Sequence, residues 1–196
     1  MGKIKSALEL ALERTESVSG GKESIALFQA KQKGKKLANE FLSGSITSFE
    51  TALRDEDDKA RQNLKQGIFD VLISRITLPA TKDDSESLER AGNGLCLIIG
   101  NKVFNDLMKQ FRQLMTQFLD EAAEYQKAII AQYEPKLRQK EEEIARRYGQ
   151  RIKIEPMQDP EFAAFFNQHM NALKGNYQSV VDQVREQAAQ YFQGNV

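Results

Sequence analysis

Hydrophobic residues recur at helical spacing along almost the whole chain. The clearest example is a stripe between residues 104 and 148, where an apolar or aromatic side chain follows every three or four positions. Its mean step of about 3.67 residues predicts a single straight or slightly right-handed helix over about 103–148, unlike a leucine zipper. One expected apolar position, at Lys140, carries a charge instead. The stripe consists of Phe104, Met108, Phe111, Met115, Phe118, Ala122, Tyr125, Ile129, Tyr133, Leu137, Ile144 and Tyr148.

A proline lies inside this predicted helix. Pro135 falls midway between Tyr133 and Leu137, so at about 100° per residue it faces away from the stripe. Its ring displaces one backbone hydrogen bond and bends the helix toward the packed side. We therefore expect one long helix kinked at Pro135, which ends at Gly149 after two arginines in its last turn.

A second long helix is predicted at the C-terminus, over about 160–193. Asp159 is its expected N-cap and Pro160 its first residue. Its apolar positions advance at about 3.6 residues per turn, so it is expected to pack antiparallel on the 103–148 helix. These positions are Phe162, Phe166, His169, Leu173, Tyr177, Val180, Val184, Ala188 and Tyr191.

The first 82 residues predict about three shorter helices. The pair Gly20 and Gly21 is expected to end the first helix, and Gly34 lies inside the second. Thr47 and Glu50 have the spacing of a capping box, which predicts a third helix from about residue 49 to residue 72.

The sequence then predicts a loop and a further helix. Pro79 ends the preceding segment, and Asp83 or Ser85 is the expected cap of the next helix. The glycine-rich patch AGNGLCLIIGNK, at 91–102, predicts either a break or a tightly packed helical turn. Alternating apolar and polar positions, typical of strands, are confined to RIKIE at 151–155.

These patterns predict an all-α, elongated helical bundle. Residues 1–82 and 83–196 are expected to form an N-terminal helical segment and a long antiparallel hairpin within one structural unit. A helix of about 45 residues is roughly 68 Å long, whereas a compact chain of this size is about 42 Å across. The projecting stripe needs cover, so we expect a homodimer or another helical protein partner.

Composition narrows the function without defining it. Lys plus Arg and Asp plus Glu both number 28, so no net charge attracts nucleic acid or anionic lipid. The single cysteine excludes an intramolecular disulfide and favours a reducing compartment, so we expect a cytoplasmic protein. The longest apolar run, LCLII, is too short to cross a membrane. MGKIKS fits the pattern for myristoylation of Gly2, although so short a pattern recurs by chance.

Few residues suggest chemistry. Cys96 lies in an apolar run that raises a thiol pKa, and His169 lies on an apolar helical stripe, so both are read as packed residues and not as a catalytic pair. The acidic run RDEDDKAR lacks the spacing of a calcium loop and is read as a solvated helix face. Neither SGGKES nor GNG completes a phosphate-binding motif. We therefore expect no catalytic residue, no metal and no cofactor.

One local basic cluster is present. Lys31, Lys33, Lys35 and Lys36 lie within six residues, but they spread around the predicted helix and no aromatic residues alternate with them. The cluster favours a wet helical surface over a nucleic-acid site.

The sequence thus favours a non-enzymatic helical interaction protein, such as an adaptor, an assembly factor or a complex subunit. The alternatives are a peripheral membrane protein that uses the N-terminal amphipathic helix, and a weak nucleic-acid binder that uses the lysine cluster. The candidate interaction stripe comprises Phe104, Phe111, Phe118, Tyr125, Ile129, Tyr133, Leu137, Ile144 and Tyr148. Intrachain core is the competing interpretation of the same stripe.

Overall fold

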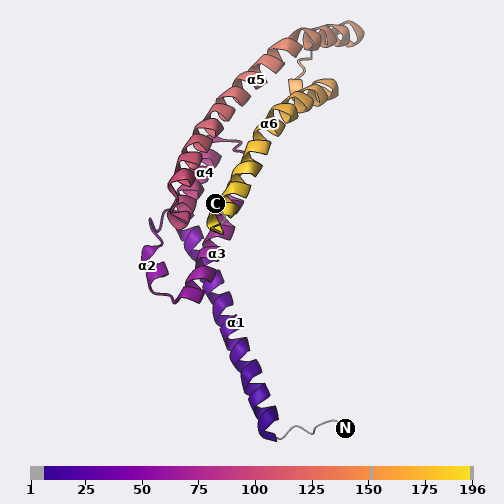
Figure 1. Ribbon diagram of the computed structural model, residues 1–196. Coiled ribbons are helices and arrows are strands. Elements are labelled where there is room, and N and C mark those ends of the chain that lie inside the picture. The colour runs from indigo at the N-terminus through magenta and orange to yellow at the C-terminus, as the bar shows by residue number, and fades with distance from the viewer. Residues whose placement is uncertain (1–6, 151, 195–196) are drawn as a thin grey trace. The chain divides into compact units, whose positions relative to one another are not determined.

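A computed structural model describes the backbone of residues 7–150 and 152–194, and the side chains of those residues from position 24 onward. Within these residues the regular structure is entirely helical, which confirms the predicted all-α bundle (Figure 1). The α-helices are α1 (Ala7–Leu42), α2 (Glu50–Arg54), α3 (Asp58–Ser74), α4 (Lys82–Ile99), α5 (Lys102–Tyr148) and α6 (Pro160–Phe192), and a short 3₁₀ helix, η1 (Pro156–Gln158), precedes α6.

The chain forms two compact units. The first unit contains the chain up to Arg75 together with Arg90–Asn101, and the second contains Ile76–Glu89 together with the chain from Lys102 onward. Helix α4 therefore contributes its first part to the second unit and its remainder to the first.

Helix α1 is longer than the sequence predicted. It runs without interruption from Ala7 to Leu42, so the predicted break at Gly20 and Gly21 is wrong. A glycine in a helix interior costs about 1 kcal/mol relative to alanine. Two glycines weaken a helix of 36 residues without ending it, because the residues before and after them favour the helical conformation. The N-terminal amphipathic helix of the membrane alternative falls on residues whose side chains are not described, and Gly2 lies outside the described residues altogether.

Glycines allow the helices of the first unit to approach closely. A Cβ atom added at Gly34 of α1 would lie 2.1 Å from the Leu64 carbonyl oxygen of α3, and Gly67 of α3 has the same relation to the Lys31 carbonyl oxygen. Gly94 lies inside α4, and an added Cβ would lie 2.7 Å from the Leu72 side chain, so the first part of the glycine-rich patch is a tightly packed helical turn. The patch also contains a break, because α4 ends at Ile99 and Gly100, with a φ of +66°, leads to the start of α5 at Lys102.

The predicted third helix is divided in two. Helix α2 ends at Arg54, and α3 begins at Asp58 after the N-cap Asp57, whose side chain accepts a hydrogen bond of 2.9 Å from the Ala60 amide. The acidic run therefore forms this junction and is not one continuous helix face. The Thr47–Glu50 capping box is also wrong, because the Glu50 amide donates to Ser48 Oγ at 3.1 Å.

Helix α4 starts earlier than predicted, at Lys82, with Thr81 in the cap position in place of Asp83 or Ser85. Thr81 Oγ1 accepts a hydrogen bond of 3.2 Å from the Asp84 amide, while Asp84 Oδ2 accepts one of 2.9 Å from the Thr81 amide. This reciprocal arrangement resembles a capping box and satisfies two amide groups at once. The expected caps Asp83 and Ser85 lie inside the helix instead.

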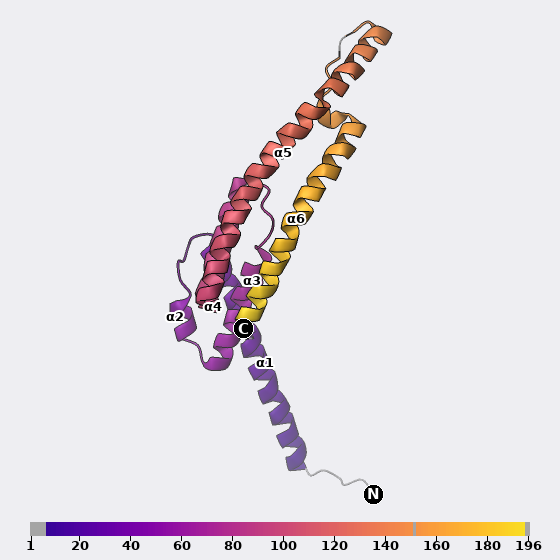
Figure 2. The same cartoon turned by 45° about the horizontal axis from the view of Figure 1, so that its top comes forward.

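The second unit confirms the predicted antiparallel hairpin. Helix α5 continues through Pro135, whose side chain is exposed, and α5 and α6 lie side by side in both views (Figures 1 and 2). The two helices are antiparallel, so residue numbers fall along α6 as they rise along α5. The aromatic ring pairs that follow this register are Phe104–Tyr191, Phe118–Tyr177, Tyr125–His169 and Tyr133–Phe162.

Candidate functional site

The predicted interaction stripe of α5 is mostly buried, and Ile129, Tyr133 and Leu137 form a core cluster with Phe162 and Met170 of α6. Phe104, Phe111, Phe118, Ile129, Tyr133 and Leu137 are buried, and Tyr125 and Ile144 are half-buried. Tyr148, at the end of the helix, is 74% exposed. Because α6 pairs with most of the stripe, the projecting surface from which a homodimer was inferred is reduced to its last turn. The homodimer stays a prediction.

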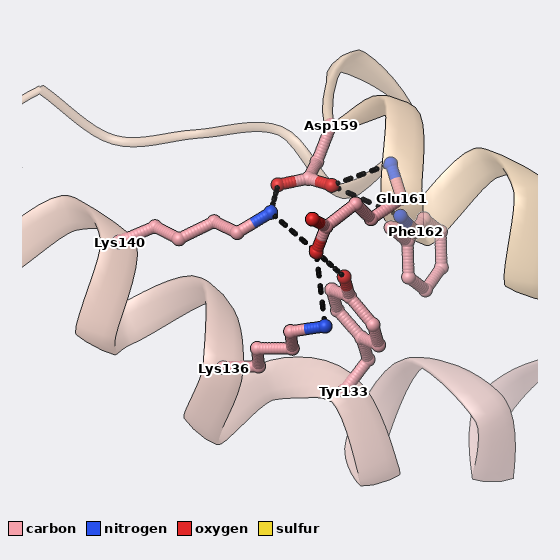
Figure 3. A network of polar contacts seen from close by, with 6 residues as sticks. All are labelled: Tyr133, Lys136, Lys140, Asp159, Glu161 and Phe162. Carbon is pink, nitrogen blue, oxygen red and sulfur yellow. Dashed lines mark hydrogen bonds and ion pairs between the residues drawn. The ribbon is translucent and has the colours of Figure 1, made fainter.

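An ion-pair network, which we call the clamp, joins the start of α6 to α5. Lys140 Nζ lies 2.5 Å from Asp159 Oδ2 and 3.0 Å from Glu161 Oε2 (Figure 3). Glu161 Oε2 also lies 2.9 Å from Lys136 Nζ and accepts a hydrogen bond of 3.3 Å from the Tyr133 hydroxyl. Lys140, the charged residue in an otherwise apolar stripe, therefore joins α5 to the start of α6 through two ion pairs.

Asp159 serves both the clamp and the helix cap. Its Oδ1 accepts hydrogen bonds of 2.9 Å from the amides of Glu161 and Phe162, while Oδ2 receives Lys140. Asp159 is only 5% exposed, so its charge needs these partners. The predicted cap Asp159 and first residue Pro160 are both confirmed.

The clamp keeps its carboxylates ionised. Hydrogen bonds from Lys136 and Lys140, reinforced by their charges, lower the pKa of Glu161 to about 2. The hydrogen bond from Lys140 and the amide of Phe162 lower the pKa of Asp159. Asp159 and Glu161 in turn raise the pKa of Lys140. Each of these charges is paired with a neighbour of opposite sign, so the arrangement holds the start of α6 against α5.

An apolar groove of about 780 Å³ follows the α5–α6 pair. Its floor contains Phe118 and Ala122 of α5 and Phe166 and Met170 of α6. The loop Leu78–Ala80 also lines the groove, and so does η1 through Pro156 and Met157. A groove of this size, with apolar walls and few polar groups, is the usual form of a binding site in a helical bundle.

The polar side chains that line this groove are not engaged elsewhere. In the described part of the chain, the side-chain amides of Gln126, Asn167 and Asn171 make no hydrogen bond to protein, and Glu155 and Lys174 make no ion pair. The exposed positions among them are free to meet a bound molecule. This contrasts with the clamp, where every charge has a partner.

His169 and Cys96 belong to different units. His169 Nδ1 and the Tyr125 hydroxyl lie 3.0 Å apart in a hydrogen bond, and the Phe165 ring lies 4.3 Å from the imidazole, centroid to centroid. Cys96 is half-buried in α4. Within the described residues, no group of three His, Cys, Asp or Glu side chains has the arrangement of a metal site.

The lysine cluster is partly neutralised within the first unit. Lys31 Nζ lies 2.8 Å from Asp70 of α3, and Lys33 Nζ lies 2.7 Å from Glu56. Lys36 is exposed and Lys35 is half-buried. Two of the four charges thus hold α1 to neighbouring segments, which weakens the case for a phosphate-binding surface.

Sequence reasoning missed the groove. The apolar stripe includes the groove residues Phe118 and Ala122, but the groove also requires a second row of α5 beside the stripe. This row consists of Leu119, Ala123, Gln126 and Ile130. The remaining walls of the groove come from the loop at Pro79 and from η1, which are distant in sequence. The small side chains at positions 122 and 123 were the signal that the sequence offered. They indicate a groove only when α5 and α6 are known to pack as a hairpin.

The described residues define an all-α protein in which an antiparallel helical hairpin carries an apolar groove. None of the described helices has the length and apolar character of a membrane span. The chain belongs to a family of unknown function, DUF6657, whose family model matches residues 50–190 and so includes the groove and the clamp. Comparison with curated proteins and with solved structures finds no match.

Proposed function

We propose that this protein is a non-enzymatic helical interaction protein that binds a partner protein in the groove between α5 and α6. The observation that carries this proposal is the apolar groove of about 780 Å³, lined by side chains from both long helices. A third helix placed there would bury apolar surface in the same way that α5 and α6 bury each other. Met157 and Met170 suit such a surface, because methionine adapts to different partners.

The clamp holds the two helices that line the groove at a fixed separation. It fixes the start of α6 to α5 through Lys140, Asp159 and Glu161, close in sequence to the groove residues Glu155 and Phe162. A groove with a fixed width is already organised before a partner arrives, and prior organisation lowers the entropic cost of binding. In this proposal, the ion pairs of the clamp maintain the geometry of the groove.

A photo-crosslinking experiment tests this proposal. A photoreactive amino acid is placed at Ala123, which lines the groove, and in a matched variant at Ala128. Both are exposed alanines of α5, but Ala128 lies about 140° further round the helix. In cells of the native host, we expect position 123 to crosslink a defined protein that position 128 does not reach.

Purified components then complete the test. Binding of the identified protein should fall about tenfold or more with Ala123→Glu, because a charge is forced against apolar surface. Ala128→Glu should leave binding unchanged. Equal crosslinking at both positions, or partner binding that is insensitive to Ala123→Glu, contradicts the proposal.

A further inference from the structure

The length of the groove sets the size of its occupant. Its lining extends from Phe118 to Ile130 on α5 and from Phe162 to Lys174 on α6. Twelve residues at 1.5 Å per residue give a length of about 18 Å for each wall. An α-helix of about three turns has this length, and placed beside α5 and α6 it would complete a three-helix arrangement.

The α6 wall of the groove carries a polar row beside an apolar row. On α6, Asn167, Asn171 and Lys174 line the groove at i, i+4 and i+7, which places them along one helical edge. Phe162, Phe166 and Met170 form a parallel apolar row at i, i+4 and i+8. A partner helix with an apolar stripe beside a polar stripe matches both rows at once.

The opposite wall allows close approach. Ala122 and Ala123 present small side chains toward the groove on α5, so the backbone of a third helix can lie near that helix. Extended aliphatic chains gain most from enclosed pockets, whereas this groove also exposes three side-chain amides to its contents. The amides favour an occupant that offers its own donors and acceptors over a lipid tail.

The two unpaired charges of the lining differ in sign. Glu155 comes just before η1, ahead of the start of α6, and Lys174 lies at the C-terminal end of the α6 lining. Neither has an ion-pair partner in the described residues. Opposite charges at separate positions select a ligand by its charge pattern, because like charges repel a mismatched partner.

We infer that the occupant of the groove is an amphipathic α-helix of a partner protein, about three turns long, with an acidic side chain for Lys174 and a basic side chain for Glu155. This inference rests on the proposed function, which it narrows to one kind of partner. Its apolar stripe contacts Phe166 and Met170, and its polar flank meets Asn167 and Asn171.

A displayed library of helix-forming 16-residue peptides is the probe, with the full-length chain as the target. We expect the recovered binders to be amphipathic and to carry an acidic and a basic residue about two to three turns apart. Their affinity should fall about tenfold with Ala123→Glu or with Lys174→Glu. Ala128→Glu should have no effect. Circular dichroism confirms that each variant remains helical.

A charge exchange gives the decisive measurement. A recovered peptide whose acidic residue is changed to lysine should bind Lys174→Glu more tightly than it binds the unchanged protein. Binders that respond to Ala123→Glu but ignore Lys174→Glu and Glu155→Lys would overturn the inferred partner chemistry and leave the groove function intact. Absence of binders, or preferential binding of phosphatidylcholine vesicles that is lost with Ala123→Glu, would also overturn the inference. Failure of crosslinking at position 123 is a separate result, which bears on the proposed function itself.

Discussion

Gly34 of α1 and Gly67 of α3 lie at the same crossing of two helices, and each takes the place where a side chain would meet the other backbone. An added Cβ would be 2.1 Å from the Leu64 carbonyl oxygen at Gly34 and 2.1 Å from the Lys31 carbonyl oxygen at Gly67. Backbone atoms on both sides cannot swing away as a flexible side chain can. The crossing therefore requires glycine at both positions.

Substitution of either glycine by alanine should destabilise the first unit. The methyl group forces α1 and α3 apart, and overpacking of this kind typically costs about 1–3 kcal/mol or more. The gain in helix propensity, about 1 kcal/mol, is too small to offset it. Chemical denaturation followed by circular dichroism measures the change for Gly34→Ala and Gly67→Ala. Unchanged stability in both variants would show that the crossing is looser than described.

Gly175→Ala is the matched control, and it should have the opposite sign. Gly175 lies inside α6, and an added Cβ would meet no heavy atom within 4 Å. Alanine then removes only the conformational penalty of glycine, so stability should rise by about 0.5–1 kcal/mol. A loss of stability measured by the same denaturation experiment would mean that this face of α6 is covered.

Removal of the proline in α5 should stabilise the hairpin. Pro135 is exposed and breaks the hydrogen bond that residue 135 would donate to the Ala131 carbonyl. Pro135→Ala restores that donor at no cost in packing, and a helix-interior proline costs about 3 kcal/mol relative to alanine. The melting temperature should rise. A fall would indicate that Pro135 gives α5 a shape that its fit to α6 requires.

Asp159→Ala should lose both the α6 cap and the carboxylate partner of Lys140. Loss of an N-cap alone costs about 0.5–2 kcal/mol, so we expect a destabilisation in the upper part of that range. Asp159→Asn keeps an acceptor for the Phe162 amide and should be milder. Equal effects from the two variants in thermal unfolding would show that the charge, and not the cap, dominates.

The clamp predicts a particular pH dependence. The pKa of Glu161 is about 2 in the folded protein and about 4.3 in an unfolded chain. A carboxyl whose pKa falls on folding stabilises the native state above its unfolded pKa, and this contribution disappears as pH falls toward the folded pKa. The melting temperature of Glu161→Gln should therefore be below that of the unchanged protein at pH 6, and the two should converge near pH 2.

A surface ion pair provides the comparison for this titration. Glu142 Oε2 lies 3.9 Å from Arg146 on an exposed turn of α5. Glu142→Gln should change the melting temperature little across the same pH range, because a single exposed pair at 3.9 Å contributes little to stability, whereas Glu161 contacts both Lys136 and Lys140. An equal pH response in both variants would mean that the Glu161 network has no special role.

Local sequence signals predicted the hairpin well. The apolar stripe from Phe104, the cap at Asp159 and the stop at Gly149 gave the bounds of α5 and α6 to within a residue. Each signal acts on its own helix, so it can be read without knowing what that helix packs against. The errors in the N-terminal part arose because glycine and acidic residues have several local uses. Gly20 and Gly21 do not end a helix, and Asp57 begins one.

The sequence by itself determined the all-helical class and the two long helices, because side-chain periodicity and capping are properties of neighbouring residues. Only the tertiary structure decided that Gly34 and Gly67 share one crossing, that Lys140 reaches Asp159, and that side chains of α5 and α6 line a common groove. Each of these features joins residues from separate helices. Their meeting depends on helix register and distance, which no local pattern specifies.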